Sequence, residues 1–185
     1  MKRKIISHIG LLSFLLFFSS SLFAINTFKQ DTCAVNDFCE TAIPIDNVIA
    51  DEGFVCVEGC TVGATPEFFN NNCQIGVFPT VWYSVITEGG TLMNIQVSSN
   101  DIASPTITVF QMGSDCSDLI QIPMSQGNLP CIIGSNGVAE AIGTDIGSNT
   151  RYLIAVNSYD KIGGDFTLCI NTISVASVCV IDREV

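Results

Sequence analysis

The residues of this 185-residue chain whose types could do chemistry are nine cysteines, eighteen carboxylates and one histidine. The histidine, His8, lies near the N-terminus, ahead of every cysteine. Catalytic triads and Cys-His proteases need an imidazole to accept a proton near neutral pH. If the segment that carries His8 is removed on export, neither these sites nor zinc sites with histidine ligands are expected.

The first 24 residues are typical of a secretory signal peptide. Lys2, Arg3 and Lys4 precede an apolar run over residues 9–18, and a cut is expected after Ala24. A membrane-spanning helix needs about 20 mostly apolar residues, and a serine run interrupts this one earlier. We therefore predict a secreted bacterial protein, extracellular or on the cell surface, with no transmembrane anchor in the mature chain.

Carboxylates dominate the charge. The formal charge is −11, and loss of three of the seven basic residues with the signal peptide makes the chain more acidic still. Nucleic acid is not an expected partner, because phosphates repel such a chain. A pair of carboxylates is the remaining hydrolytic option, as in glycosidases. Eighteen acids make some pair inevitable, so their presence alone does not predict an enzyme.

The nine cysteines all follow the signal peptide, which predicts disulfides formed in an oxidising compartment. Cys116 and Cys131 bracket a turn-rich segment, and we expect them to pair. We expect Cys73 to pair with Cys56 or Cys60. Nine is odd, so one thiol stays free or forms an intermolecular disulfide, and Cys33 and Cys179, near the two ends, are its best candidates.

Short β-rich runs fill the rest of the chain, separated by Gly, Asn, Asp, Ser and Pro, and predict an antiparallel sandwich or barrel. Residues 91–98 place Met93, Ile95 and Val97 inward and Asn94 and Gln96 outward. Gly163 and Gly164 are expected to supply positive φ in the turn between the last two strands. The expected strands lie at 79–87, 91–98, 105–111, 119–122, 131–133, 138–142, 151–157 and 165–172.

Five segments together resemble a secreted β-sandwich module of Bacteroidetes surface proteins, related to the bacterial pre-peptidase C-terminal domain. They are NDFCETAIPI at 36–45, TVGATPE at 61–67, PTVWYSVIT at 79–87, the span from ITVFQMGSDCSDL to Cys131, and RYLIAVNSYDKIGGDFTLCI at 151–170. The resemblance implies an all-β, antiparallel, jelly-roll-like sandwich of about eight or nine strands over residues 35–173. Residues 25–34 are then a polar leader, and residues 174–185 a C-terminal tail.

The same resemblance implies a weak calcium candidate. Some relatives bind calcium through an Asn-Asp pair near the start, matched here by Asn36 and Asp37, and an acid before the Trp/Tyr strand. Thr80 stands where that acid usually lies. Calcium prefers six to eight oxygen ligands that include carboxylates. The alternative to calcium binding is that Asp37 caps a turn before Phe38 and Cys39. Apart from calcium, no cofactor is expected.

Surface contact is expected at a hairpin tip. Asn157 ends the predicted strand at 151–157, and Tyr159 and Asp160 lie in the turn that follows. Loops on a rigid sandwich often carry function. Trp82 and Tyr83 could stack on sugars, but a lone tryptophan in a central strand usually packs in the core. We therefore favour Trp82 as a core residue.

The function expected from these observations is a non-catalytic extracellular binding or adhesion module with a glycan or matrix-protein ligand. One alternative is a small carboxylate-dependent glycan hydrolase, marked by two acids about 5–10 Å apart across a groove. Another is a structural envelope or matrix component, assembled through strand edges or the odd cysteine.

Overall fold

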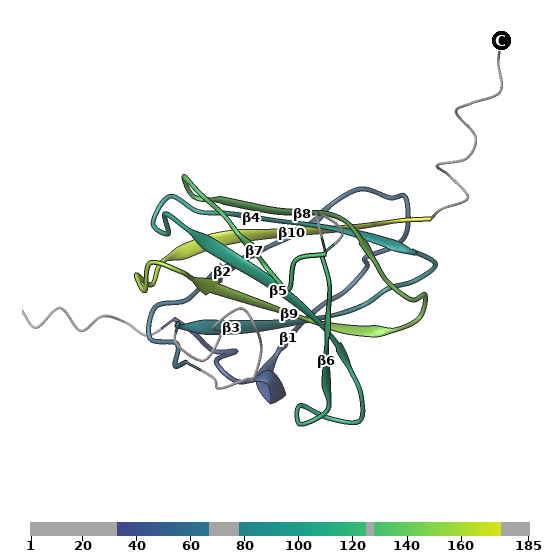
Figure 1. The fold of residues 1–185 in the computed structure, drawn as a ribbon, viewed down its shortest axis with the longest axis horizontal. Coiled ribbons are helices and arrows are strands. Elements are labelled where there is room, and N and C mark those ends of the chain that lie inside the picture. Colours follow the sequence, from purple (N-terminus) through teal and green to yellow (C-terminus); the bar gives the residue numbers. More distant parts are fainter. Residues whose placement is uncertain (1–32, 67–77, 125–127, 175–185) are drawn as a thin grey trace, which may run out of the picture.

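The computed structural model describes residues 33–66, 78–124 and 128–174 of the chain. They form a sandwich of two β-sheets, seen edge-on in Figure 1. The predicted signal peptide, Cys73 and Cys179 lie outside the described residues, as do most of the leader and tail. Among the described residues, no helix is long and apolar enough to cross a membrane.

Ten strands and one helical turn make up the described fold, two strands more than the eight runs read from the sequence. In chain order the elements are η1 (Cys39–Thr41), β1 (Ile43–Ile45), β2 (Val55–Cys60), β3 (Thr80–Ile86), β4 (Leu92–Ser98), β5 (Pro105–Met112), β6 (Leu119–Ile122), β7 (Ile132–Ile133), β8 (Val138–Asp145), β9 (Arg151–Ser158) and β10 (Asp165–Ile173). The all-β, disulfide-reinforced sandwich is therefore confirmed.

One sheet has the strand order β1-β3-β9-β5-β6, with β7 also paired to β5, and the other has the order β2-β10-β4-β8. The named strands pair antiparallel except at one edge, where β1 pairs parallel with β3. Pro44 lacks a backbone N–H, and an edge strand tolerates it. The two strands missed in the sequence are β1, which is only three residues long, and β2, whose VCVEGC sequence carries Glu58 and Gly59, residue types that are depleted in strands.

The main core lies between the sheets and follows the period-two pattern of the strands. Val81, Tyr83 and Val85 of β3 pack there with Met93, Ile95 and Val97 of β4. The inward direction of the three β4 side chains was predicted. β9 and β10 contribute Tyr152, Ile154 and Val156, and Phe166, Leu168 and Ile170. Burial of this apolar surface is the main force that holds the sheets together.

A second apolar cluster covers the outer face of the β1-β3-β9-β5-β6 sheet. Trp82 is fully buried there with Phe110, Leu153 and Ala155, and its ring lies 5.6 Å from that of Phe110. Cys39 of η1 completes the cluster, and η1 and β6 lie on this side of the sandwich (Figure 1). Trp82 is therefore a buried residue, but Tyr83, which points to the opposite side of β3, is buried too.

The disulfides correct the predicted pairings. Cys33 bonds to Cys60, Cys39 to Cys116, and Cys56 to Cys169. Cys116 thus does not pair with Cys131, although Cys131 is itself disulfide-bonded. The partners expected for Cys73 are both taken, and Cys33 is not free. The physical reason is tertiary: η1 packs beside the start of the β5–β6 connection, which brings Cys39 to Cys116 across 77 residues.

All seven cysteines among the described residues are disulfide-bonded, so the odd cysteine of the chain is not one of them. Such bonds are typical of proteins that fold in an oxidising, extracytoplasmic compartment. Residues 33 and 34 are attached to the sandwich in two ways. Cys33 bonds to Cys60, and the N–H groups of Cys33 and Ala34 donate to the Val62 carbonyl.

The turn between β9 and β10 differs from the prediction. Its positive φ is at Lys161, at 64°, and not at Gly163 or Gly164. These two positions need glycine for lack of space. A Cβ at Gly164 would lie 2.5 Å from Cβ of Asp101, and one at Gly163 would lie 3.0 Å from Cα of Val62. The glycines therefore allow the loops at this end of the sandwich to approach one another.

Candidate functional site

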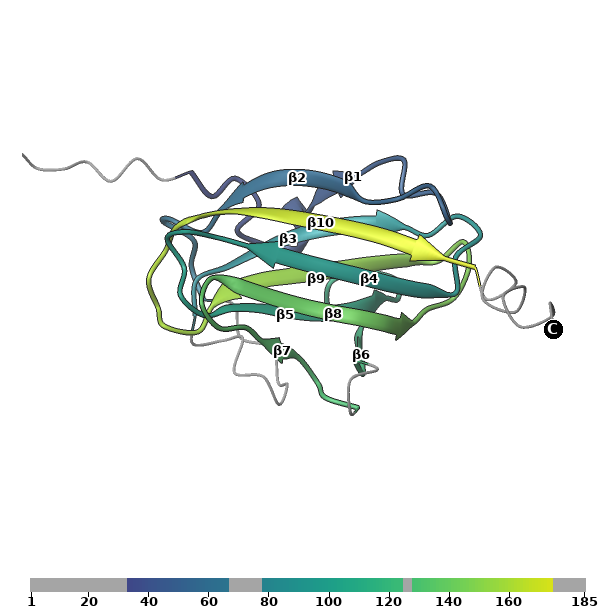
Figure 2. The same ribbon diagram turned by 90° about the horizontal axis from the view of Figure 1, so that it is seen from above.

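The outer faces of the two sheets differ. β3 and β9 are buried on both sides, whereas β4 and β10 alternate between buried and partly exposed residues. Figure 2 shows β2, β10, β4 and β8 side by side in the foreground, with no described segment across them. We call the outer side of these four strands the open face. Its outward side chains include Glu58, Thr167, Asn171, Asn94, Gln96 and Glu140.

Amide and carboxylate side chains hold one another in place on the open face. Asn94 Nδ2 donates to Asn171 Oδ1 at 2.9 Å, and Gln96 Nε2 donates to Glu140 Oε1 at 2.6 Å. The Thr167 hydroxyl lies 3.1 Å from Glu58 Oε2. These contacts join all four strands in a row of oriented donors and acceptors. Such a row is pre-organised to hydrogen-bond a polar ligand.

The backbone supports this row at a β-bulge. The register of β4 against β8 shifts between Met93 and Ile95, and Gly143 of β8 has a positive φ of 65°. Asn94 Oδ1 accepts the Gly143 N–H at 2.7 Å, which fixes the bulge and the Asn94 amide together. Bulges re-aim side chains in this way.

An apolar hollow of about 300 Å³ adjoins the row. Phe54 and Ile142, each 55% exposed, line it together with Asn94, Gln96 and Glu140. The hollow therefore combines apolar walls with polar groups at one edge. That combination is typical of small-ligand sites.

Two grooves lie at the end of the open face where β2 ends and β10 begins. One, of about 490 Å³, is lined by Ser98, Asn100 and Asp101. The other, of about 460 Å³, reaches round the β2 edge to Asn36 and Tyr83. Glu58 and Asp165 line both. Burial raises the pKa of Tyr83; a hydrogen bond with Asn36 offsets part of this rise, and the nearby Glu58 charge adds a smaller rise.

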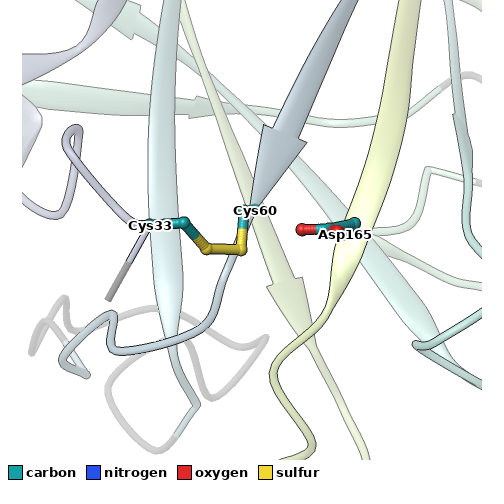
Figure 3. Close-up of side chains that lie close together, drawn as sticks. All are labelled: Cys33, Cys60 and Asp165. Atoms are coloured by element: carbon teal, nitrogen blue, oxygen red, sulfur yellow. A yellow bond between two sulfur atoms is a disulfide. The ribbon is translucent and has the colours of Figure 1, made fainter. Parts of the chain in front are cut away.

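The Cys33–Cys60 disulfide lies beside the Asp165 carboxylate (Figure 3). The two sulfurs and a carboxylate oxygen are within 4.8 Å of one another, a spacing that three metal ligands could have. The sulfurs are bonded to each other, however, and metal-binding cysteine requires the thiolate. The oxidised protein therefore has no thiolate metal site here.

The predicted contact residues Asn157, Tyr159 and Asp160 do not form one surface. Asn157 is fully buried, because β9 extends through it to Ser158. Tyr159 is 45% exposed, and its ring packs 5.2 Å from that of Phe78. Asp160 accepts hydrogen bonds from the Ser158 hydroxyl and from the N–H groups of Ala103 and Ile162.

Asp160 is thus a connector between the β9–β10 turn and the β4–β5 loop. Its partial burial raises the pKa of the carboxyl, but the hydrogen bonds from Ser158, Ile162 and Ala103 lower it by more. The net pKa lies below the usual value. The carboxylate is therefore the form that the folded loops hold.

The calcium candidates Asn36 and Asp37 have partners within the protein. Asn36 Nδ2 donates to the backbone carbonyl of Trp82 at 2.6 Å. The backbone carbonyl of Asn36 accepts the backbone N–H of Trp82 at 2.9 Å. Asp37 accepts the Thr65 N–H at 2.5 Å and the Thr65 hydroxyl at 2.9 Å. Thr80, at the place of the expected acid, is buried and donates to the Phe78 carbonyl.

These residues do not fit calcium. They offer one carboxylate, both of whose oxygens already accept hydrogen bonds, and calcium prefers several. Asn36 and Asp37 instead hydrogen-bond the segment before η1 to β3 and to the turn after β2. Sequence reasoning missed the open face as a site. The outward direction of Asn94 and Gln96 was predicted, but these two residues were not recognised as part of a binding surface.

The described chain is a two-sheet β-sandwich domain. Comparison of the sequence with protein-family models gave no match, and comparison with curated proteins gave none either. Among solved structures, the chain is similar to PliG, a periplasmic inhibitor of g-type lysozyme from Aeromonas hydrophila. That similarity has 14% identity and a TM-score of 0.41, over 70% of this chain and 94% of the other.

Two further similarities are to the pre-peptidase C-terminal domain of a Bacillus anthracis collagenase and to CorA, a surface-associated copper-binding protein of Methylomicrobium album BG8. The first has 17% identity and a TM-score of 0.40, over 70% of this chain and 92% of that one. The similarity to CorA has 11% identity and a TM-score of 0.39, over 71% of this chain and 100% of the CorA chain. All three are distant likenesses of β-sandwich domains, and none assigns the chain to a family.

Proposed function

We propose that this protein is a secreted, non-catalytic binding module whose ligand is an uncharged glycan held on the open face. One observation carries the proposal. The outer face of one sheet is sealed by a second apolar cluster, whereas the outer face of the other presents a row of oriented amides and carboxylates. The disulfides and the signal-like N-terminal sequence support secretion.

The chemistry of the open face suits sugars. Asn94, Gln96 and Asn171 offer planar amides that pair with neighbouring hydroxyls, and Glu58 and Glu140 accept hydroxyl protons. Phe54 and Ile142 offer apolar contact to the C–H side of a sugar ring. Among the described residues the only Lys and Arg are Lys161 and Arg151, and neither is on β2, β10, β4 or β8. Anionic glycans would therefore be repelled.

The resemblance to secreted modules of Bacteroidetes surface proteins supports an adhesion or targeting role. In that setting, glycan binding would hold the module, or a protein attached to it, at a polysaccharide surface. A protein ligand is the competing possibility, and a basic one would suit the acidic charge of the chain.

Affinity electrophoresis of the secreted protein tests the proposal. Gels would contain β-glucan, xylan or galactomannan as neutral polysaccharides and alginate as an anionic one, each with and without calcium. We expect retardation by at least one neutral polysaccharide, none by alginate, and no calcium dependence. Failure of every neutral polysaccharide to retard the protein would contradict glycan binding.

A carboxylate-dependent glycan hydrolase is the second candidate, favoured by the two acids, Glu58 and Asp165, that line both end grooves. Its test is turnover of the same polysaccharides, read as new reducing ends. A hydrolase would lose turnover in Glu58→Gln or Asp165→Asn while still being retarded in the gels. Our proposal predicts no turnover by the unaltered protein.

A further inference from the structure

A row of buried polar side chains crosses the other sheet on its covered side. Thr80 of β3, Asn157 of β9 and Thr106 of β5 are direct register partners. Their exposed fractions are 0%, 0% and 1%. Thr108 lies two residues further along β5 on the same face and is also fully buried. The row lies in an otherwise apolar setting next to Trp82 and Ala155.

Most polar side-chain atoms of this row have no hydrogen-bond partner within the protein. Thr80 donates to the Phe78 carbonyl. Neither Nδ2 nor Oδ1 of Asn157 has a hydrogen-bond partner, and the Thr106 and Thr108 hydroxyls have none either. A buried amide or hydroxyl without a partner is strongly unfavourable. Three such residues on adjacent positions therefore point to a guest that pairs with them.

The three side chains are close enough for one molecule to bridge them. Register partners in an antiparallel pair have Cβ atoms about 4.5–5.5 Å apart, and diagonal neighbours about 7–8 Å apart. Asn157 and Thr106 are register partners, and Asn157 and Thr108 are diagonal neighbours. The residue opposite Thr108 is Ala155, whose side chain is a single methyl group. A group that donates and accepts at once can span these positions.

We infer that ordered water occupies a buried site between β9 and β5 and bridges the Asn157 amide to the Thr106 and Thr108 hydroxyls. Water matches the donors and acceptors of all three side chains, and a buried water usually makes about three hydrogen bonds. No residue of the row is charged, so a neutral guest fits better than an ion. The site is separate from the open face and independent of the proposed function.

Thr172 provides a matched control in the other sheet. Its hydroxyl is also buried without a partner, but it points into the apolar core opposite Met93. A single orphan hydroxyl gives a water too few partners, and an isosteric apolar group there should be neutral or better. Thr106→Val should instead remove one ligand of a bound water.

The test combines unfolding with direct detection of water. In the full secreted protein, Thr106→Val should lower the urea midpoint of unfolding, whereas Thr172→Val should leave it unchanged or raise it. In the unaltered protein, NMR should show long-lived cross-peaks between water and the Asn157 side-chain amide protons, a readout that needs no variant to fold. A raised midpoint in both variants together with absent cross-peaks would overturn the inference. So would a crystal structure in which Asn157 bonds Thr106 directly with no water between them.

Discussion

Gln96 on β4 and Glu140 on β8 are register partners on the open face, joined by a 2.6 Å hydrogen bond from Nε2 to Oε1. The Glu140 Oε2 atom and the Gln96 Oε1 atom take no part in this bond, and both can act as acceptors. Because both side chains are held by a partner, little side-chain freedom is lost when a ligand binds. This pair is therefore central to the proposed glycan site.

Replacement of Gln96 tests that role. Gln96→Ala should weaken glycan binding about fivefold, because one hydrogen bond is worth about 1 kcal/mol and about 1.4 kcal/mol corresponds to a factor of ten. Titration calorimetry with a retarding polysaccharide would measure the loss. Gln121→Ala on β6 makes the same chemical change on the other sheet and should bind normally. Equal losses in both variants would contradict the assignment.

Trp82 reports on the covered face, because it is the only tryptophan of the chain and is fully buried. Its fluorescence should be blue-shifted, resistant to acrylamide quenching, and red-shifted on unfolding. Trp82→Ala should destabilise the fold by about 3–5 kcal/mol, measured by urea unfolding followed by circular dichroism. Free quenching of the native emission would show that the second apolar cluster does not form.

The Cys39–Cys116 bond should be found by mass spectrometry of peptides from a non-reducing digest. Its loop of 77 residues predicts that Cys39→Ser with Cys116→Ser lowers the free energy of unfolding by about 4.5 kcal/mol in the chain-entropy model. Single variants would expose a free thiol and are poorer tests. A Cys116–Cys131 peptide would show that the short-range pairing is the true one.

Asp160 predicts an acid-dependent loss of stability. Its pKa is lower in the folded protein than the usual pKa of an aspartate side chain, so the folded state favours the carboxylate. This contribution is fully present well above pH 4 and is lost as pH falls through the folded pKa. Asp160→Asn should therefore be less stable than the unaltered protein at pH 7, by about 1 kcal/mol given partial exposure.

The comparison is made by thermal unfolding between pH 2 and 7. The difference between Asp160→Asn and the unaltered protein should shrink toward the acid end of that range. Glu52→Gln, which removes an exposed acid elsewhere, should show no such convergence. A constant difference across the range would mean that the Asp160 charge is not what holds the two loops.

Local patterns predicted much of the fold. The alternation of residues 91–98 gave both the inward side chains of β4 and the outward amides of the open face. At β3 the expectation that Trp82 is buried was confirmed, but a period of two assigns only one side of a strand to the core and did not predict that Tyr83 is buried as well. Burial of Trp82 on the second side depends on η1 and Cys116, contacts that are distant in sequence.

The site residues were harder to predict for a similar reason. Asn157 was expected at a hairpin tip because it ends the predicted strand 151–157, but β9 continues to Ser158 and Asn157 is fully buried. The disulfide pairings depend on which distant segments meet, and many pairings of the cysteines are compatible with the sequence. Asn94 and Gln96 lie on different strands from Thr167 and Glu140, so only the sheet order β2-β10-β4-β8 unites them.

The most direct test of the open face as the ligand site is NMR chemical-shift mapping during titration of the secreted protein with a neutral hexasaccharide cut from a polysaccharide that retards it. We predict that the shifted backbone amides cluster on β10, β4 and β8, around Asn94, Gln96 and Glu140. Shifts confined to the side of η1 and β6, or no shifts at saturating hexasaccharide, would contradict the proposed site.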